Sequence, residues 1–176
     1  MKRLVILVLA LSFLTGVGAI PFAPYSGLAF AQEDISKHPS CPYCGMDRQK
    51  FAHSRVYVEY DDNSTLGTCS IHCAAVDMAV HIDKAPVKIW VGDYNTKQLI
   101  DAEEAVWTIG GNKPGVMTRR AKWAFGTKES AEAYVQANGG NIAGFEEAME
   151  ATYEDMYKDT KMIREKRKMK RMMKKH

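Results

Sequence analysis

The order of predicted elements recurs once along the chain, and this recurrence constrains the fold more than any other feature. Each set reads strand, strand, helix, strand, because runs rich in β-forming residues flank an apolar pattern with helical spacing. The first set covers residues 55–60, 64–69, 71–82 and 87–91. The second set covers residues 105–109, 120–125, 127–138 and 141–145. Two successive ββαβ units predict one compact α+β body with an internal structural repeat.

The N-terminus carries the pattern of an export signal. Lys2 and Arg3 precede an almost wholly apolar run over residues 4–14, and Ala29-Phe30-Ala31 offers a cleavage site with small residues. This layout predicts a secretory signal peptide over residues 1–31, with an uncleaved membrane anchor as the alternative. We therefore expect an exported protein, periplasmic or otherwise extracytoplasmic.

The remaining chain divides by composition into three parts. Residues 32–40 are polar and read as a linker, residues 41–150 form the predicted body, and residues 151–176 form a basic, methionine-rich tail, helical or disordered. The net charge is −7 over residues 32–157 and +8 over residues 158–176. Such a tail suits an anionic membrane surface, an acidic partner or copper capture by its methionines. Export argues against nucleic acid as a partner.

The hexapeptide Cys41-Pro42-Tyr43-Cys44-Gly45-Met46 permits two interpretations. Its first four residues match a glutaredoxin dithiol, but that site follows a strand and opens a helix, and no strand is predicted before Cys41. The second interpretation is a grip for a soft metal ion. A thiolate and a thioether together select Cu(I), and Gly45 permits the turn that aims both sulfurs at one ion. A third donor must then come from elsewhere.

The other cysteines leave the metal chemistry open. Cys69 and Cys73 flank the start of a predicted helix, so both sulfurs can reach the same ion. Together with Cys41 and Cys44 they suit a four-thiolate zinc site, and disulfides are the alternative. His72 lies between them and is either a further ligand or, as we predict, a solvated helix residue.

Three segments together resemble one known family. They are CPYCGM, TCSIHCAAVDMA and the run from LIDAEEAVW through GNKPGVMTRRAKWAFGTKESAEAYVQANGGNIAGFEEA. This combination is similar to the NosL family of nitrous-oxide-reductase accessory proteins. The resemblance implies two ββαβ units and an exported protein that delivers Cu(I) to a multicopper enzyme, with nitrous oxide reductase as the expected client. It also implies Cys44, Met46 and Met117 as the Cu(I) ligands.

Two other functions compete with copper delivery. The four cysteines alone are compatible with an interaction domain stabilised by zinc or disulfides, without copper transfer. A thiol-based enzyme on the same fold is the second rival. No nucleophilic triad, phosphate-binding loop or carboxylate pair supports catalysis, so we predict a binding protein and not an enzyme.

Overall fold

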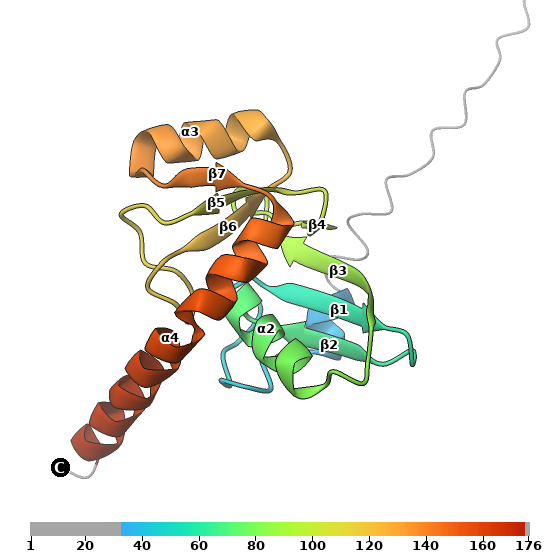
Figure 1. Cartoon of the computed structure of the whole chain (residues 1–176). Helices are drawn as coiled ribbons and strands as arrows, with labels where there is room; N and C mark the ends of the chain where they lie inside the picture. Colours follow the sequence, from blue (N-terminus) through green and yellow to red (C-terminus); the bar gives the residue numbers. More distant parts are fainter. Residues whose placement is uncertain (1–32, 175–176) are drawn as a thin grey trace, which may run out of the picture.

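The computed structural model describes residues 33–174 and contains two antiparallel sheets with helices packed on them (Figure 1). The first unit contains β1 (Val56–Tyr60), β2 (Thr65–Thr68), α2 (Ile71–Val80), β3 (Pro86–Gly92) and β4 (Leu99–Asp101). Its strands lie in the order β2-β1-β3-β4. Because β3 returns to pair with β1, the first strand of the unit becomes central in its sheet.

The second unit repeats this arrangement on a smaller scale. It contains β5 (Val106–Ile109), β6 (Lys122–Phe125), α3 (Lys128–Asn138) and β7 (Asn141–Ala143). The order β6-β5-β7 again places the first strand between the second and the third. The predicted α+β fold of two ββαβ units is confirmed, and the repeat holds in strand order as well as in element order. β4, a short extra strand beside β3, was not predicted.

Local sequence explains where the helices begin and end. The Thr127 hydroxyl accepts a hydrogen bond from the Ser130 N–H, which caps the start of α3, and Gly139 ends that helix at φ 75°. The long helix α4 (Phe145–Met173) begins where the Glu147 carboxylate accepts a hydrogen bond from the Gly144 N–H (2.7 Å). The tail over residues 151–176 was predicted to be helical or disordered, and α4 is helical over it as far as Met173.

The main core lies where α2 and α4 meet the two sheets. Val56 and Val58 of β1, Ala74 of α2, Trp107 of β5 and Ala148 of α4 all belong to one buried cluster. The Trp107 indole also donates a hydrogen bond to a backbone carbonyl, so its polar group is paired. α4 packs on α2 and on β5, and its C-terminal half extends beyond both sheets (Figure 1). This crossing brings the tail beside the first unit.

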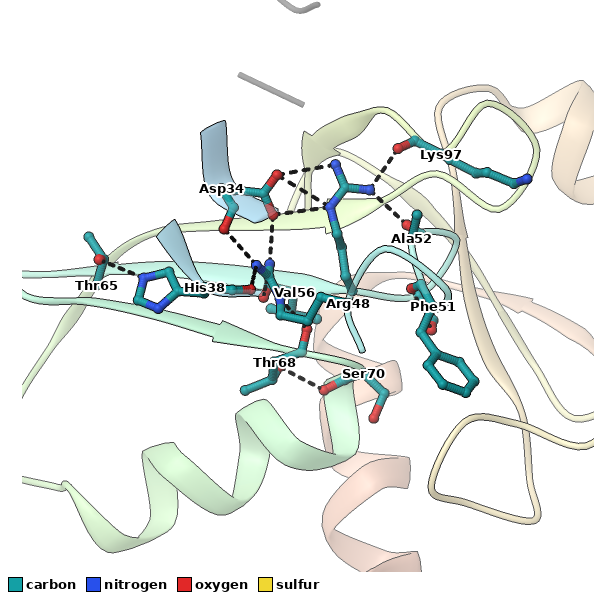
Figure 2. Close-up of polar contacts among 12 residues, drawn as sticks. Asp34, His38, Arg48, Phe51, Ala52, Val56, Thr65, Thr68, Ser70 and Lys97 are labelled. Atoms are coloured by element: carbon teal, nitrogen blue, oxygen red, sulfur yellow. Dashed lines mark hydrogen bonds and ion pairs between the residues drawn. The ribbon is translucent and has the colours of Figure 1, made fainter. Parts of the chain in front are cut away.

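The segment before Cys41 is integrated into the body. Residues 33–37 form a helical turn, and the Asp34 carboxylate is buried between two arginine side chains. Arg48 donates to Asp34 Oδ2 at 2.6 Å, and Arg55 donates to the same oxygen at 3.0 Å. Figure 2 shows Arg48 also reaching backbone carbonyls of His38, Val56 and Thr68. Residues 33–40, which were predicted to belong to a linker, are therefore packed into the body, because the Asp34 carboxylate pairs with two buried cations.

The predicted signal peptide, residues 1–31, lies outside the described residues. Within residues 33–174, no helix combines the length and the apolar character that crossing a membrane requires.

Candidate metal centre

The hexapeptide from Cys41 to Met46 forms a closed loop. The Cys41 N–H donates to the Met46 carbonyl (2.9 Å), and the Gly45 N–H donates to the Cys41 carbonyl (2.8 Å). Gly45 adopts φ 74°, a left-handed conformation that glycine takes without steric cost. The predicted tight turn at Gly45 is therefore present, and it holds Cys44 and Met46 on one short loop.

Side chains from the first unit fix this loop in place. The Tyr43 hydroxyl donates a hydrogen bond to the Asp77 carboxylate on α2, and the Tyr60 hydroxyl donates to the other carboxylate oxygen. Burial raises the pKa of Tyr43 well above its usual value, so the phenol remains a neutral donor. Arg48, just after the loop, joins it to the buried network at Asp34. The loop is thus joined to α2 through Tyr43 and to the buried network at Asp34 through Arg48.

All four cysteines meet at the N-terminal end of α2. Their Sγ atoms lie within 4.8 Å of one another, with 3.3 Å between Cys44 and Cys69 and 3.9 Å between Cys69 and Cys73. All four thiols are free. Cys41, Cys69 and Cys73 are fully buried, whereas Cys44 is partly exposed. The two cysteine pairs predicted from their spacing thus form a single cluster.

The thiols perturb one another's ionisation. Hydrogen bonds from Cys44, Cys69 and Cys73 lower the pKa of the Cys41 thiol. The same close contacts raise the pKa values of Cys69 and Cys73, because a second thiolate beside the first is disfavoured. The pKa of the Cys44 thiol is lowered as well, so the contacts within the cluster lower the pKa values of Cys41 and Cys44 and raise those of Cys69 and Cys73.

A cavity of about 710 Å³ opens beside this cluster. Cys44, Met46 and Met117, the three ligands implied by the family resemblance, all line it. Met117 arrives from the loop between β5 and β6, about seventy residues beyond the hexapeptide in the chain. It packs against the cysteine cluster together with Met46. The structure therefore brings the three predicted sulfur donors to one place.

The backbone at Met117 is unusual. Its φ is 61°, a left-handed conformation that costs a residue with a side chain roughly 1–2 kcal/mol. Strain of this kind clusters at functional sites, where the surrounding structure imposes it. β6 begins only at Lys122, so Met117 lies in the loop before that strand and packs against the buried cysteines.

Helix α4 forms the wall opposite the hexapeptide. Met162 lines the cavity and its sulfur accepts a hydrogen bond from Arg119 Nε (3.4 Å). Arg167 lines it as well and donates to the Cys44 carbonyl (3.3 Å). Lys113 and Lys166 add positive charge, and none of the described lining residues is acidic. The cavity thus combines soft sulfur donors with a basic rim.

Sequence reasoning missed one cavity residue, His53, and placed His72, which lies outside the cavity, wrongly. The His53 ring lies 5.4 Å from the Trp123 ring, and burial lowers its pKa, so the imidazole is neutral. Met162 belongs to the tail that was predicted to be helical or disordered, and it lies on α4 in the wall of the cavity. His72 was predicted to be solvated and is instead buried, because α4 covers this face of α2 and places Asp159 Oδ2 3.8 Å from the His72 ring.

The comparisons with known proteins match this geometry to one family. The NosL family model matches residues 32–153. The chain belongs to the NosL family. The fold is also similar to the crystal structure of the copper chaperone NosL from Shewanella denitrificans, with a TM-score of 0.52 and 20% identity over 61% of this chain and 87% of that chain. A sequence search of curated proteins finds no match.

The NosL match places the donors in two different parts of the chain. Cys44, Met46 and Met117 lie within the matched residues, whereas Met162 and Arg167 lie beyond residue 153. One wall of the cavity is therefore supplied by a part of α4 outside the family match. Chemically, the cysteine cluster and the neighbouring thioethers form a donor set for soft metal ions, and the NosL fold holds these sulfurs beside an opening to solvent.

Proposed function

We propose that this NosL protein is an exported carrier of Cu(I), not an enzyme, and that it passes the ion to a multicopper enzyme. Cys44, Met46 and Met117 bind the ion, and nitrous oxide reductase is the first candidate client. The observation that carries the proposal is the meeting of these three sulfurs, from two distant segments, at one cavity. The name of the Shewanella protein, a copper chaperone, supports it.

The donor types favour Cu(I) over harder ions. A thiolate and two thioethers are soft and polarisable, and zinc or magnesium sites seldom use a thioether. Met46 is held by the closed loop and Met117 by its strained backbone, so the donors are positioned before the ion arrives. Three donors at an open cavity leave the ion accessible to a partner's ligands. Such a site suits transfer by ligand exchange.

The charges around the cavity suit an acidic client. Lys113, Arg119, Lys166 and Arg167 surround the sulfur donors, and the exposed end of α4 continues with Lys170, Arg171 and Lys174. Basic surfaces steer acidic partners and raise the association rate, an effect that salt weakens. We therefore propose that the tail docks on an acidic surface of the client. Attraction to an anionic membrane surface uses the same charges and remains the alternative for the tail.

The direct test is an anaerobic Cu(I) titration against a competing chelator, using residues 32–176 and their Met46→Leu and Met117→Leu variants. Leucine keeps most of the volume but removes the sulfur. Loss of a group that only supports a metal ligand costs roughly 10–100-fold in affinity. We therefore expect each variant to lose at least about 100-fold in Cu(I) affinity with an unchanged circular dichroism spectrum.

Met149→Leu provides the matched control, because Met149 packs in the main core away from the cavity. Its Cu(I) affinity should equal that of the wild type. Unaltered affinity in both cavity variants would exclude the proposed ligand set. Transfer from the loaded protein to copper-free nitrous oxide reductase, compared with another copper-free multicopper enzyme, then identifies the client.

A further inference from the structure

Three of the four clustered cysteines have no role in the copper proposal. Only Cys44 faces the cavity, whereas Cys41, Cys69 and Cys73 lie beneath it with at most 1% of their surface exposed. Two sulfurs come from the closed loop and two from the start of α2, so a group bound among them would join the loop to the helix. Buried cysteines in an inert core need not converge, and these four do.

The spacing of the sulfurs suits a tetrahedral ion. A Zn–S bond of about 2.3 Å places the corners of a four-thiolate site roughly 3.8 Å apart. The Cys69–Cys73 separation is 3.9 Å, the Cys44–Cys69 separation is 3.3 Å, and all four atoms lie within 4.8 Å of one another. A disulfide requires about 2.05 Å, which is much shorter than either of these separations. Changes of up to about 1 Å in the separations between sulfur atoms would give the tetrahedral arrangement.

We propose that Cys41, Cys44, Cys69 and Cys73 bind one zinc ion through their thiolates. Four sulfur donors, three of them sealed from solvent, are the features of a closed structural zinc site. Zinc joins the hexapeptide loop to α2 and so fixes the position of Cys44 and Met46. The zinc site is separate from the copper donors except for Cys44, whose sulfur is common to both. This inference stands on the cysteine geometry and does not depend on copper binding.

Because the copper and zinc sites share only Cys44, substitutions can distinguish the binding of the two metals. Met46 and Met117 contribute nothing to zinc, because zinc sites do not use thioethers. Cys41, Cys69 and Cys73 are too deeply buried to reach the cavity that holds the methionines. Substitutions therefore separate the two metals: methionine changes affect copper alone, changes of the buried cysteines affect zinc, and a change of Cys44 affects both.

The test uses reduced, metal-free residues 32–176 and titrates Co²⁺ anaerobically, because Co²⁺ in a tetrahedral thiolate site absorbs strongly. We expect one equivalent to bind with thiolate-to-cobalt charge-transfer bands, and one equivalent of Zn²⁺ to abolish them. Zinc should also raise the melting temperature, since it binds only the folded chain. Cys69→Ser should lose the charge-transfer bands, and Met46→Leu and Met117→Leu should keep them.

Cys44→Ser keeps the proposal testable if Cys69→Ser fails to fold, because Cys44 is the partly exposed member of the cluster. It should retain three thiolates, with weaker charge-transfer absorption and weaker zinc binding. Failure of the reduced wild type to bind Co²⁺ or Zn²⁺ would overturn the inference, as would a second equivalent of Cu(I) that Zn²⁺ cannot displace from the cluster. Neither result would alter the copper test, which compares the Cu(I) affinities of the methionine variants with that of the wild type.

Discussion

At the scale of single residues, the site depends on a turn that only glycine adopts readily. Gly45 lies between the two donors of the hexapeptide, with φ 74° and no atom within 4 Å of the position that a Cβ would occupy. Space is therefore not limiting there. The backbone conformation is the constraint, and it aims Cys44 and Met46 at the same cavity.

We predict that Gly45→Ala destabilises the metal-free protein by about 1 kcal/mol. A left-handed conformation costs alanine roughly 1–2 kcal/mol, and the stiffer unfolded chain offsets about 0.4–1 kcal/mol of this cost. Urea unfolding measures the difference. Gly126→Ala is the control, because its Cβ would meet only ordinary contacts from 3.5 Å and its backbone is not left-handed. Equal losses of unfolding free energy in the two variants would show that an alanine side chain does not strain the turn at Gly45.

The residues of the site differ in how far sequence could predict them. Cys44 and Met46 are local, because one glycine between two soft donors already implies a turn. Met117 was assigned by its resemblance to a family motif, and no local pattern would have chosen it over other methionines. His72 was misplaced because its burial depends on α4, more than seventy residues away in the chain. Local spacing cannot report which helix covers which face.

At the scale of elements, α4 joins the two units and completes the cavity. Lys122 begins β6, and Arg120 lies just before that strand. Both side chains donate to the Asp155 carboxylate of α4, Arg120 at 2.7 Å and Lys122 at 2.6 Å. The Lys122 ammonium is buried, so this pairing compensates a cation taken out of water. The contact positions the next two turns of α4, which carry Met162 to the cavity. The helix thus acts as a wall of the site as well as a tail.

We predict that Met162→Leu weakens Cu(I) binding by up to about tenfold, equivalent to about 1.4 kcal/mol. The effect should be smaller than at Met117, because the Met162 sulfur also accepts a hydrogen bond from Arg119. Competition with a chelator measures the affinity. Met169→Leu, one heptad further along the same helix and 51% exposed, is the matched control and should bind copper as the wild type does. Identical affinities for the two variants would remove Met162 from the site.

Most elements were predictable because their patterns are local. β1, β2, β3, β5 and β6 carry β-forming residues between turns, and α3 has both of its caps in the sequence. β4 was missed because its three residues, Leu99–Asp101, are too few to show alternation, and it forms by pairing with β3. The turn at residues 33–37 was missed for a related reason. Its polar composition resembles a linker until Arg48 and Arg55 approach it.

At the scale of the whole molecule, one buried carboxylate connects the N-terminal segment to the body. The Asp34 side chain is 2% exposed and contacts Arg48 and Arg55, whose side chains are 0% and 1% exposed. Arg48 lies two residues after Met46, the last residue of the hexapeptide loop, and it also donates to the backbone before α2 (Figure 2). The network therefore fixes the loop relative to the helix from which Cys73 projects. Stability and site geometry depend on the same contacts.

We predict that Asp34→Asn destabilises the protein by about 3–5 kcal/mol, because it removes the carboxylate with which two buried guanidinium groups pair. Urea unfolding of the metal-free protein, followed by circular dichroism, measures the loss. Asp62→Asn is the control: Asp62 pairs with Lys84 on the surface, where water screens the charges, and its removal should leave the unfolding midpoint unchanged. If Asp34→Asn were as stable as the control, residues 33–40 would be dispensable. The buried network would then not be what holds the cysteine loop against α2.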